Sequence, residues 1–237
     1  NLDNTLMVST LPWIFSDYQA AEDAFYGAGG EYIDSVLQTK GLYYLGAVHN
    51  GFKAMTNSKH PIEKPEDLKG LKMRIPGGDF FSAFYTAFGA SPQAMSWSEV
   101  FTALQQGTID GQENPIDFLY NGGYGEVCDY VTLTGHVKMP LQWVMSENVW
   151  NSMSENQQQI LVEAGLEAGE INNEICLSSE EEYKQKFRDD GVTVIELDDA
   201  KLQEFKDAII PLYSHPEIIS DWSDPELYQT IRTMLTE

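Results

Sequence analysis

The sequence predicts an α/β fold, and three of its features support that prediction. Short apolar runs that suit buried strands alternate with amphipathic runs that suit helices, and the connections between them are short. Glycine and proline stand where helices end and turns begin. One helical pattern, at residues 154–190, is longer than a single small domain can cover.

The chain opens with predicted helices followed by a strand. Residues 17–37 have helical periodicity, interrupted by a glycine break at residues 27–30. Residues 41–48 are apolar and rich in Tyr and Leu, which indicates a buried strand. A turn and a short helix are predicted at residues 65–70, with Pro early and Gly as the stop, and residues 71–75 are predicted to form the next strand.

The segment after this strand predicts a helix with a phenylalanine face. Asp79 can cap it through a side-chain oxygen, and Gly89 closes it. Phe80, Phe84 and Phe88 recur at helical spacing, so we expect them to point into the core.

Further elements continue the alternation to the end of the chain. A capped helix is predicted to begin near Ser98 and to stop at Gly107, and residues 109–111 are strand-like. Residues 192–195 predict a strand and residues 202–212 a closing helix. Strands and helices joined in this way are typical of an α/β lobe.

The longest predicted element is a helix from Ser154 to Asp190. Residues 154–157 have the form of a capping box, in which Ser and Gln bond free backbone N–H groups. About 36 residues of helix are roughly 54 Å long, so we expect the helix to cross between two lobes. Its apolar face is predicted from residues that recur at helical spacing, namely Ile160, Ala164, Ala168, Ile171, Ile175, Tyr183 and Phe187.

The charge balance argues against two classes of partner. The chain has 37 acidic against 14 basic side chains and a net charge of -23, a field that repels phosphate backbones and anionic lipid. We therefore expect no nucleic acid and no membrane surface as a partner. No apolar run approaches the roughly 20 residues that span a bilayer, and residues 1–9 lack the pattern of a signal peptide.

Nothing in the sequence predicts a cofactor or a metal ion. The four histidines are scattered, and none stands at ligand spacing from another or from a cysteine. Residues 27–30 lack the third glycine and the preceding strand of a dinucleotide-binding loop. Cys128 and Cys176 are far apart in sequence, and they can form a disulfide or remain free thiols.

Arg74 and Gly78 mark the first candidate site. Arg74 ends a predicted strand beside a glycine loop and a helix N-terminus. Backbone N–H groups and the positive end of a helix attract anions, and a guanidinium fork matches a carboxylate. These residues predict an anion site, and the alternative is a strand arginine paired with one of the many surface acids.

The polar segment Asp110–Pro115 marks a second candidate site. It lies at a predicted strand-to-loop junction, where α/β proteins place ligand contacts, and its Asn114 amide can bond a polar ligand. Asp-Gly and Asn-Pro are also turn formers, so a plain turn is the alternative. Asp110 and Glu113 together suggest a hydrolytic acid–base pair, but two nearby acids are expected by chance in so acidic a chain.

His136 and Trp97 are candidates with a structural alternative. His136 follows Gly135 at the end of a predicted strand, where it can line a cleft or serve as a satisfied structural histidine. Trp97 and Trp13 lie beside predicted loops and can flank a ligand, although most tryptophans belong to the core.

Four motifs occur in a fixed order along the chain. They are PEDLKGLKMRIP at 65–76, FGASP at 88–92 with SEV at 98–100, ALQQGTIDGQENP at 103–115, and LTGH at 133–136. Together they closely resemble the solute receptors of tripartite ATP-independent periplasmic (TRAP) transporters, and the resemblance runs from about Leu11 to the C-terminus. It implies a two-lobed periplasmic solute-binding protein fold, with a long helix spanning both lobes and a cleft that closes on an organic acid.

The resemblance also implies roles for five residues. Arg74 matches the family arginine that forms a salt bridge with the ligand carboxylate, and Asn114 matches the asparagine that bonds the same end. Trp97 falls where an aromatic residue usually walls the pocket, and Gly78 lies in the loop that approaches the carboxylate. Lys53 stands where many members that bind sugar acids carry a second arginine, so it keeps the charge and loses the fork.

The resemblance further predicts how the chain divides. Residues 1–50 and 140–179 are expected to form lobe I, and residues 51–139 and 180–237 to form lobe II. Members of the family normally begin earlier, so we expect the N-terminal part of lobe I to be missing from this chain.

We therefore predict a periplasmic, non-catalytic receptor. It binds a small organic carboxylate, with a sugar acid such as a uronate favoured, and delivers it to the membrane subunits of a TRAP transporter. A C4-dicarboxylate, a keto acid and an aromatic acid remain open as ligands. The alternatives are a carboxylate-sensing receptor for a membrane kinase and a sugar-acid hydrolase or lyase that uses Asp110 and Glu113.

Overall fold

The computed structural model describes Leu6 and residues 10–214, and these residues form two compact units. The C-terminal part of the predicted lobe II, residues 215–237, lies outside the described residues. Among the described residues, the first unit holds residues 6, 10–51 and 137–178, and the second holds residues 52–136 and 179–214.

The first unit is built from helices and two paired strands. Asp17 caps its first helix by accepting a hydrogen bond from the Ala20 N–H at 2.8 Å, and Gly27 separates this helix from the next, as the glycine break predicted. The strand predicted at residues 41–48 is much longer, and β6, which pairs with it, was not predicted. The elements are α1 (Tyr18–Tyr26), α2 (Ala28–Gln38), the first part of β1 (Leu42–Asn57), β6 (Lys138–Ser146), α6 (Glu147–Ser152) and the first part of α7 (Glu155–Asp189).

The second unit contains most of a seven-stranded mixed sheet in the order β3-β2-β4-β1-β5-β7, with β6 also paired to β1. Strand β2 runs parallel to β3 and β4, β4 and β5 run antiparallel to β1, and β5 runs parallel to β7. Its elements are the rest of β1, β2 (Lys72–Ile75), α3 (Asp79–Ala87), β3 (Ser91–Ala94), α4 (Trp97–Gln105), β4 (Gly111–Pro115), α5 (Ile116–Asn121), β5 (Tyr130–Leu133), the end of α7, β7 (Thr193–Glu196) and α8 (Asp199–Ile209), with short 3-10 turns at Pro65–Leu68, Tyr124–Glu126 and Ile210–Ser214.

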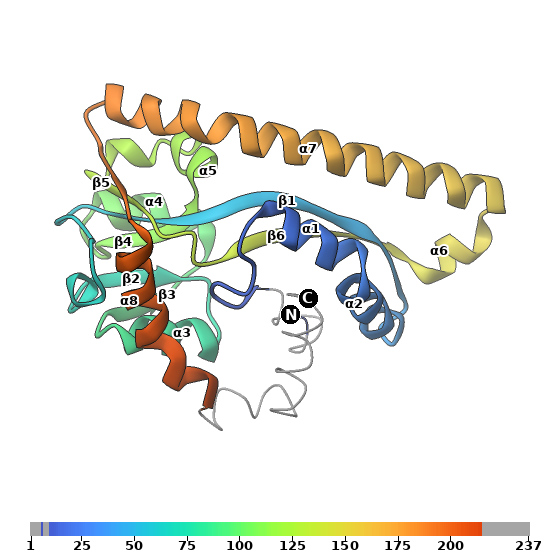
Figure 1. Ribbon diagram of the computed structural model, residues 1–237, viewed down its shortest axis with the longest axis horizontal. Coiled ribbons are helices and arrows are strands. Elements are labelled where there is room, and N and C mark those ends of the chain that lie inside the picture. The colour runs from blue at the N-terminus through green and yellow to red at the C-terminus, as the bar shows by residue number, and fades with distance from the viewer. Residues whose placement is uncertain (1–5, 7–9, 215–237) are drawn as a thin grey trace. The chain divides into compact units, whose positions relative to one another are not determined.

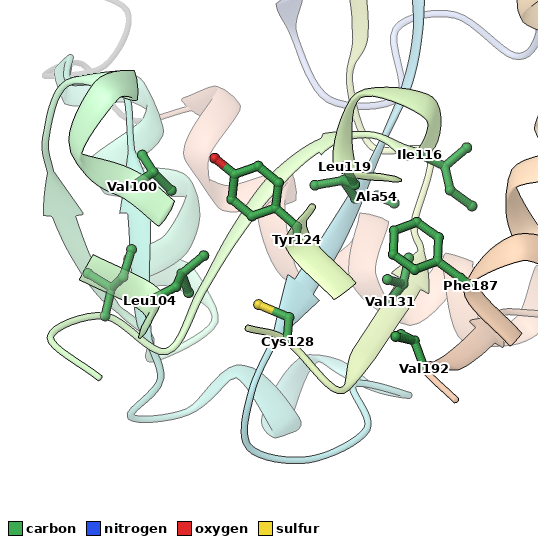
Figure 2. Packing of buried hydrophobic residues seen from close by; sticks show 11 residues of the cluster. Ala54, Val100, Leu104, Ile116, Leu119, Tyr124, Cys128, Val131, Phe187 and Val192 are labelled. Carbon is green, nitrogen blue, oxygen red and sulfur yellow. The ribbon is translucent and has the colours of Figure 1, made fainter. Parts of the chain in front are cut away.

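A buried apolar cluster holds this sheet to its helices. Figure 2 shows Phe187, from the end of α7, together with side chains from α4, α5, β5 and the segment before β7. The alternation of strand and helix therefore yields the α/β core that the sequence predicted. The fully buried members that α4, α5 and the β5 region contribute are Val100, Leu104, Ile116, Leu119, Cys128 and Val131.

Two predicted helix starts are displaced. The cap residue of α3 is Gly78, at φ 95°, and Asp79 is the first residue of the helix rather than its cap. The cap of α4 is Ser96, not Ser98, because Glu99 Oε2 accepts from both the Ser96 N–H at 3.1 Å and the Ser96 hydroxyl at 2.6 Å. Both helices otherwise form where the sequence placed them.

Helix α7 confirms the predicted long helix and corrects its predicted face. Figure 1 shows one uninterrupted helix with residues in both units. The side chains of Ile160, Ile171 and Ile175 are 54%, 52% and 58% exposed, so they do not belong to the buried face, whereas Phe187 is buried in the core as predicted. Gly165 and Gly169 are buried instead, because small residues let the helix approach the backbone of β1 closely.

Three findings concern cysteines, membrane spans and metal sites in the described residues. Cys128 and Cys176 are not joined in a disulfide, which decides between the two alternatives left by the sequence. In the part of the chain described here, no helix has both the length and the apolar character needed to cross a membrane. No group of three or more His, Cys, Asp or Glu side chains in that part is arranged to hold a metal ion.

Candidate functional site

The candidate site is built on β4, a strand whose residues are all buried. The sequence placed Asp110–Pro115 at a strand-to-loop junction, but residues 111–115 form the strand itself, between β2 and β1. The neighbouring strands β1 and β2 form backbone hydrogen bonds with β4. The polar groups of β4 that remain to form a site are therefore those of its side chains. Those side chains alternate between the two faces of the sheet. Gln112 and Asn114 therefore point one way and Glu113 the other.

Glu113 forms the centre of a buried polar cluster. Its side chain is 2% exposed and accepts three hydrogen bonds of 2.6 Å. Oε1 receives Lys53 Nζ from β1, and Oε2 receives the Tyr85 hydroxyl from α3 and His136 Nε2. Three donors around one carboxylate satisfy most of its acceptor sites.

The cluster keeps Glu113 ionised. Burial alone would raise the pKa of the Glu113 carboxyl, but attraction to Lys53 and His136, with their hydrogen bonds, outweighs burial and holds the pKa well below its ordinary value. Burial beside Glu113 raises the pKa of the Tyr85 hydroxyl well above its ordinary range. Tyr85 therefore donates to Glu113 and remains protonated.

His136 is held rigidly behind this carboxylate. Its Nδ1 lies 2.6 Å from Thr134 Oγ1, and its ring stacks on Phe84 with centroids 5.3 Å apart at 11°. The side chain is fully buried. The structural alternative for His136, a satisfied buried histidine, describes this geometry.

Arg74 is a buried cation held by a backbone carbonyl. It is 7% exposed, and its Nε and Nη2 donate to the Met95 carbonyl at 3.2 and 3.0 Å. Among the described residues, no Asp or Glu forms an ion pair with it, although Glu113 attracts it from a distance. Burial lowers the pKa of the guanidinium, which nonetheless stays charged because its ordinary pKa is so high.

Aromatic rings cover one side of Arg74. Its guanidinium carbon lies 5.7 Å from the centroid of the Trp97 ring, a cation–π geometry. Trp97 in turn contacts Phe118 and Tyr124 at centroid distances of 5.2 and 5.4 Å. Trp97 and Phe118 are partly exposed, so they can form the wall of a site that is open to solvent.

Arg74 and Asn114 lie on the same face of the sheet. Met73 pairs with Gly111, and a Cβ on Gly111 would lie 2.8 Å from Met73 Sδ, so these two residues share a face. By strand alternation, Arg74 and Gln112 share the opposite face. The Asn114 side chain is on that face too, because its Nδ2 lies 2.7 Å from Gln112 Oε1.

The structure thus brings the predicted residues into two groups. The first group lies on one face of the sheet and consists of Arg74, Trp97 and Asn114. The second consists of Lys53 and His136, which both contact Glu113. Gly78 stands apart as the exposed cap residue of α3. The sequence placed Gln112 and Glu113 within the polar candidate segment but gave neither a role of its own in binding, and it did not indicate Tyr85. The one signal for Tyr85 was a hydroxyl next to the phenylalanine face of its helix.

Asp110 and Glu113 do not form an acid–base pair. Asp110 Oδ2 accepts from the Lys72 N–H at 2.9 Å and Oδ1 lies 3.4 Å from Lys59 Nζ, so the two acids share no partner. An ionised Glu113 with three donors is also unable to donate a proton as a general acid. The geometry supports binding rather than hydrolysis.

Several known proteins resemble this chain in sequence and in fold. The chain is 33% identical over 199 residues to the 2,3-diketo-L-gulonate-binding periplasmic protein YiaO of Escherichia coli, covering 84% of this chain and 60% of that protein. It superposes with TM-score 0.87 and 33% identity on a TRAP periplasmic solute-binding protein from a Polaromonas species bound to D-erythronate, covering 98% and 75% of the two chains. A Sulfitobacter TRAP solute-binding protein with bound β-D-galacturonate gives TM-score 0.90 at 26% identity, covering 99% and 76%.

The matches also show how much of each relative this chain spans and to which family the chain belongs. The chain spans 56% to 62% of the length of the first curated relatives it matches. The named relatives are binding proteins and not enzymes. Residues 1–218 match the model of the bacterial extracellular solute-binding proteins of family 7, and the solved relatives are TRAP receptors of the predicted α/β fold. This chain therefore belongs to bacterial extracellular solute-binding protein family 7.

Proposed function

We propose that this protein is an extracytoplasmic receptor that binds a small organic carboxylate and delivers it to the membrane subunits of a TRAP transporter. Arg74 neutralises the carboxylate, Asn114 hydrogen-bonds the same end, and Trp97 packs against the ligand. The family membership and the relatives named as periplasmic binding proteins support this proposal.

One observation carries the assignment of the site. Arg74 is buried and charged, yet within the described residues only a carbonyl and an aromatic ring hold it. A buried charge is costly unless an opposite charge accompanies it. Within the described residues Arg74 donates through Nε and Nη2, so Nη1 keeps its donors for an anion. A carboxylate ligand supplies the missing charge.

Lys53 and His136 are assigned a supporting role. Their hydrogen bonds to Glu113 compensate a buried negative charge that would otherwise compete with the ligand for Arg74. We propose that Gly78 acts only through the backbone, because it has no side chain and its φ of 95° suits glycine.

A hydroxylated acid is the favoured ligand class. Three of the similar proteins are named for diketogulonate or hold erythronate or galacturonate, which are carboxylates with several further oxygen atoms. Two other relatives are named for C4-dicarboxylates and one solved neighbour holds succinate, so that class belongs in any test.

A thermal-shift screen tests the proposal. The protein is heated with uronates, aldonates, C4-dicarboxylates and keto acids. Ligand at a hundred times its Kd adds about 2.7 kcal/mol and raises Tm clearly. Arg74→Ala is expected to abolish the shift, and the control Arg188→Ala, at a partly exposed arginine of α7 paired with Glu196, is expected to retain it. Turnover of a bound acid, or an unchanged Kd in Arg74→Ala, would contradict the proposal.

A further inference from the structure

The buried amide of Gln112 has an unmet hydrogen bond. Gln112 is fully buried on β4, and its Oε1 accepts from Asn114 Nδ2 at 2.7 Å. Its Nε2 has no hydrogen-bond partner among the described residues. A buried N–H donor without a partner is rarer and more costly than an under-used carbonyl oxygen.

A half-turn of both amides removes this cost. The oxygen and nitrogen of a side-chain amide occupy nearly the same space, so hydrogen bonding decides between the two orientations. With both amides turned, Gln112 Nε2 donates to Asn114 Oδ1 across the same 2.7 Å contact. The atom left without a partner on Gln112 is then a carbonyl oxygen.

The turned orientation also changes what Asn114 offers to a ligand. In the first orientation Asn114 gives one N–H of Nδ2 to Gln112 and offers a ligand its second N–H and its carbonyl oxygen. In the turned orientation both N–H groups of Nδ2 are available, on the face of the sheet that carries Arg74. A carboxylate only accepts hydrogen bonds, so the second arrangement suits it better than the first.

We propose that Gln112 is a positioning residue that fixes the Asn114 amide with its Nδ2 toward the ligand, and thereby makes the site select carboxylates. This inference rests on the proposed function for the ligand and on the buried amide pair for the mechanism. Gln112 is assigned this indirect role because its side chain is fully buried and its hydrogen-bond partner is Asn114.

The orientation can be measured in the ligand-free protein. Side-chain ¹⁵NH₂ resonances are assigned from their loss in Gln112→Met and Asn114→Ala. A scalar coupling across the hydrogen bond, from Gln112 ¹⁵Nε2 to the ¹³Cγ of Asn114, is expected. A coupling from Asn114 ¹⁵Nδ2 to the ¹³Cδ of Gln112, or no coupling between the two amides, would overturn the inference. This measurement needs no ligand, so it stands even if the receptor function is wrong.

A double-mutant cycle tests the effect on binding. The probes are D-erythronate and D-galacturonate, whichever shifts the wild-type protein. Gln112→Met keeps the length of the side chain without an amide, and we expect it to weaken binding roughly tenfold, about the worth of one hydrogen bond to a charged group. In an Asn114→Ala background the same change should have no further effect, because Gln112 acts through Asn114. Additive losses would instead assign Gln112 a purely structural role and overturn the inference.

Discussion

Lys53 Nζ and Glu113 Oε1 lie 2.6 Å apart, and their side chains are 9% and 2% exposed. The two residues are 60 positions apart in sequence and come from neighbouring strands, β1 and β4. A buried ion pair adds little over an apolar pair of the same size, yet the loss of one partner leaves an uncompensated charge. Loss of either residue is therefore expected to destabilise the pairing of β1 with β4.

Glu113→Gln is expected to destabilise the protein strongly. The change keeps the shape of the side chain but leaves Lys53 buried without its counter-charge, which costs about 3–5 kcal/mol. The measurement is urea unfolding at pH 7. Glu182→Gln is the matched control, because Glu182 forms an exposed ion pair with Lys186 on α7 and should leave the unfolding midpoint unchanged. Equal effects of the two substitutions would show that the buried pair does not stabilise this sheet.

The same carboxylate predicts an acid-sensitive fold. The pKa of Glu113 is lower in the folded protein than the ordinary value of about 4.3, so its contribution to stability is complete above that value. The contribution is lost as pH falls toward the folded pKa, because the unfolded chain then binds a proton that the folded chain does not. The stability advantage of the wild type over Glu113→Gln should therefore narrow between pH 5 and pH 3. An advantage that stays constant over this range would contradict the lowered pKa.

Local sequence signals predicted the helices well and the polar core poorly. The capping box at Ser154 and the phenylalanine face of α3 depend on residues a few positions apart, so they are visible in sequence, and both are confirmed. The site contacts join residues far apart in the chain, such as Tyr85 and Glu113. No local pattern indicates that such a pair will meet.

Two errors have a common physical origin. Strand β4 was not recognised because Gln112 and its neighbours are polar, and sequence reasoning expects buried strands to be apolar. The middle of the buried face of α7 was missed because Gly165 and Gly169, rather than the isoleucines, lie against β1. In α7 close backbone packing takes the place of the buried apolar side chains that periodicity detects, and in β4 paired polar side chains do so.

The buried Lys138 is expected to make the free energy of unfolding rise with pH. It is buried in the first unit, with Nζ 4.2 Å from the centroid of the Tyr18 ring and 3.4 Å from the Tyr18 carbonyl oxygen. Burial lowers the pKa of Lys138 to about 7, although Glu22 opposes the shift. Between pH 7 and about 10.4 the unfolded chain binds a proton that the folded protein lacks, so stability rises with pH by at most about 1.4 kcal/mol per unit.

The variant Lys138→Met separates this effect from those of other groups. Its side chain has a similar length and no charge, so its stability should lack the part of the rise between pH 7 and 9 that Lys138 supplies. The measurement is the free energy of unfolding in urea at pH 7, 8 and 9 for both proteins. Parallel curves for the wild type and the variant would refute the lowered pKa of Lys138.

Two glycines of α7 that lie four residues apart are expected to respond oppositely to alanine. A Cβ on residue 169 would lie 2.6 Å from the Tyr26 hydroxyl, which donates to the Ala47 carbonyl at 2.8 Å. The nearest atoms to a Cβ on residue 165 are 3.6 Å away in the Trp143 ring, an ordinary contact. Gly169→Ala should therefore cost about 1–3 kcal/mol through overpacking. Gly165→Ala should be neutral or gain up to about 1 kcal/mol from helix propensity.

If the hydroxyl causes the loss, Tyr26→Phe should be less harmful in the Gly169→Ala background than in the wild type, and thermal unfolding of the four proteins measures that coupling. Equal effects of the two alanine substitutions would mean that the Tyr26 hydroxyl does not limit the size of the side chain at residue 169.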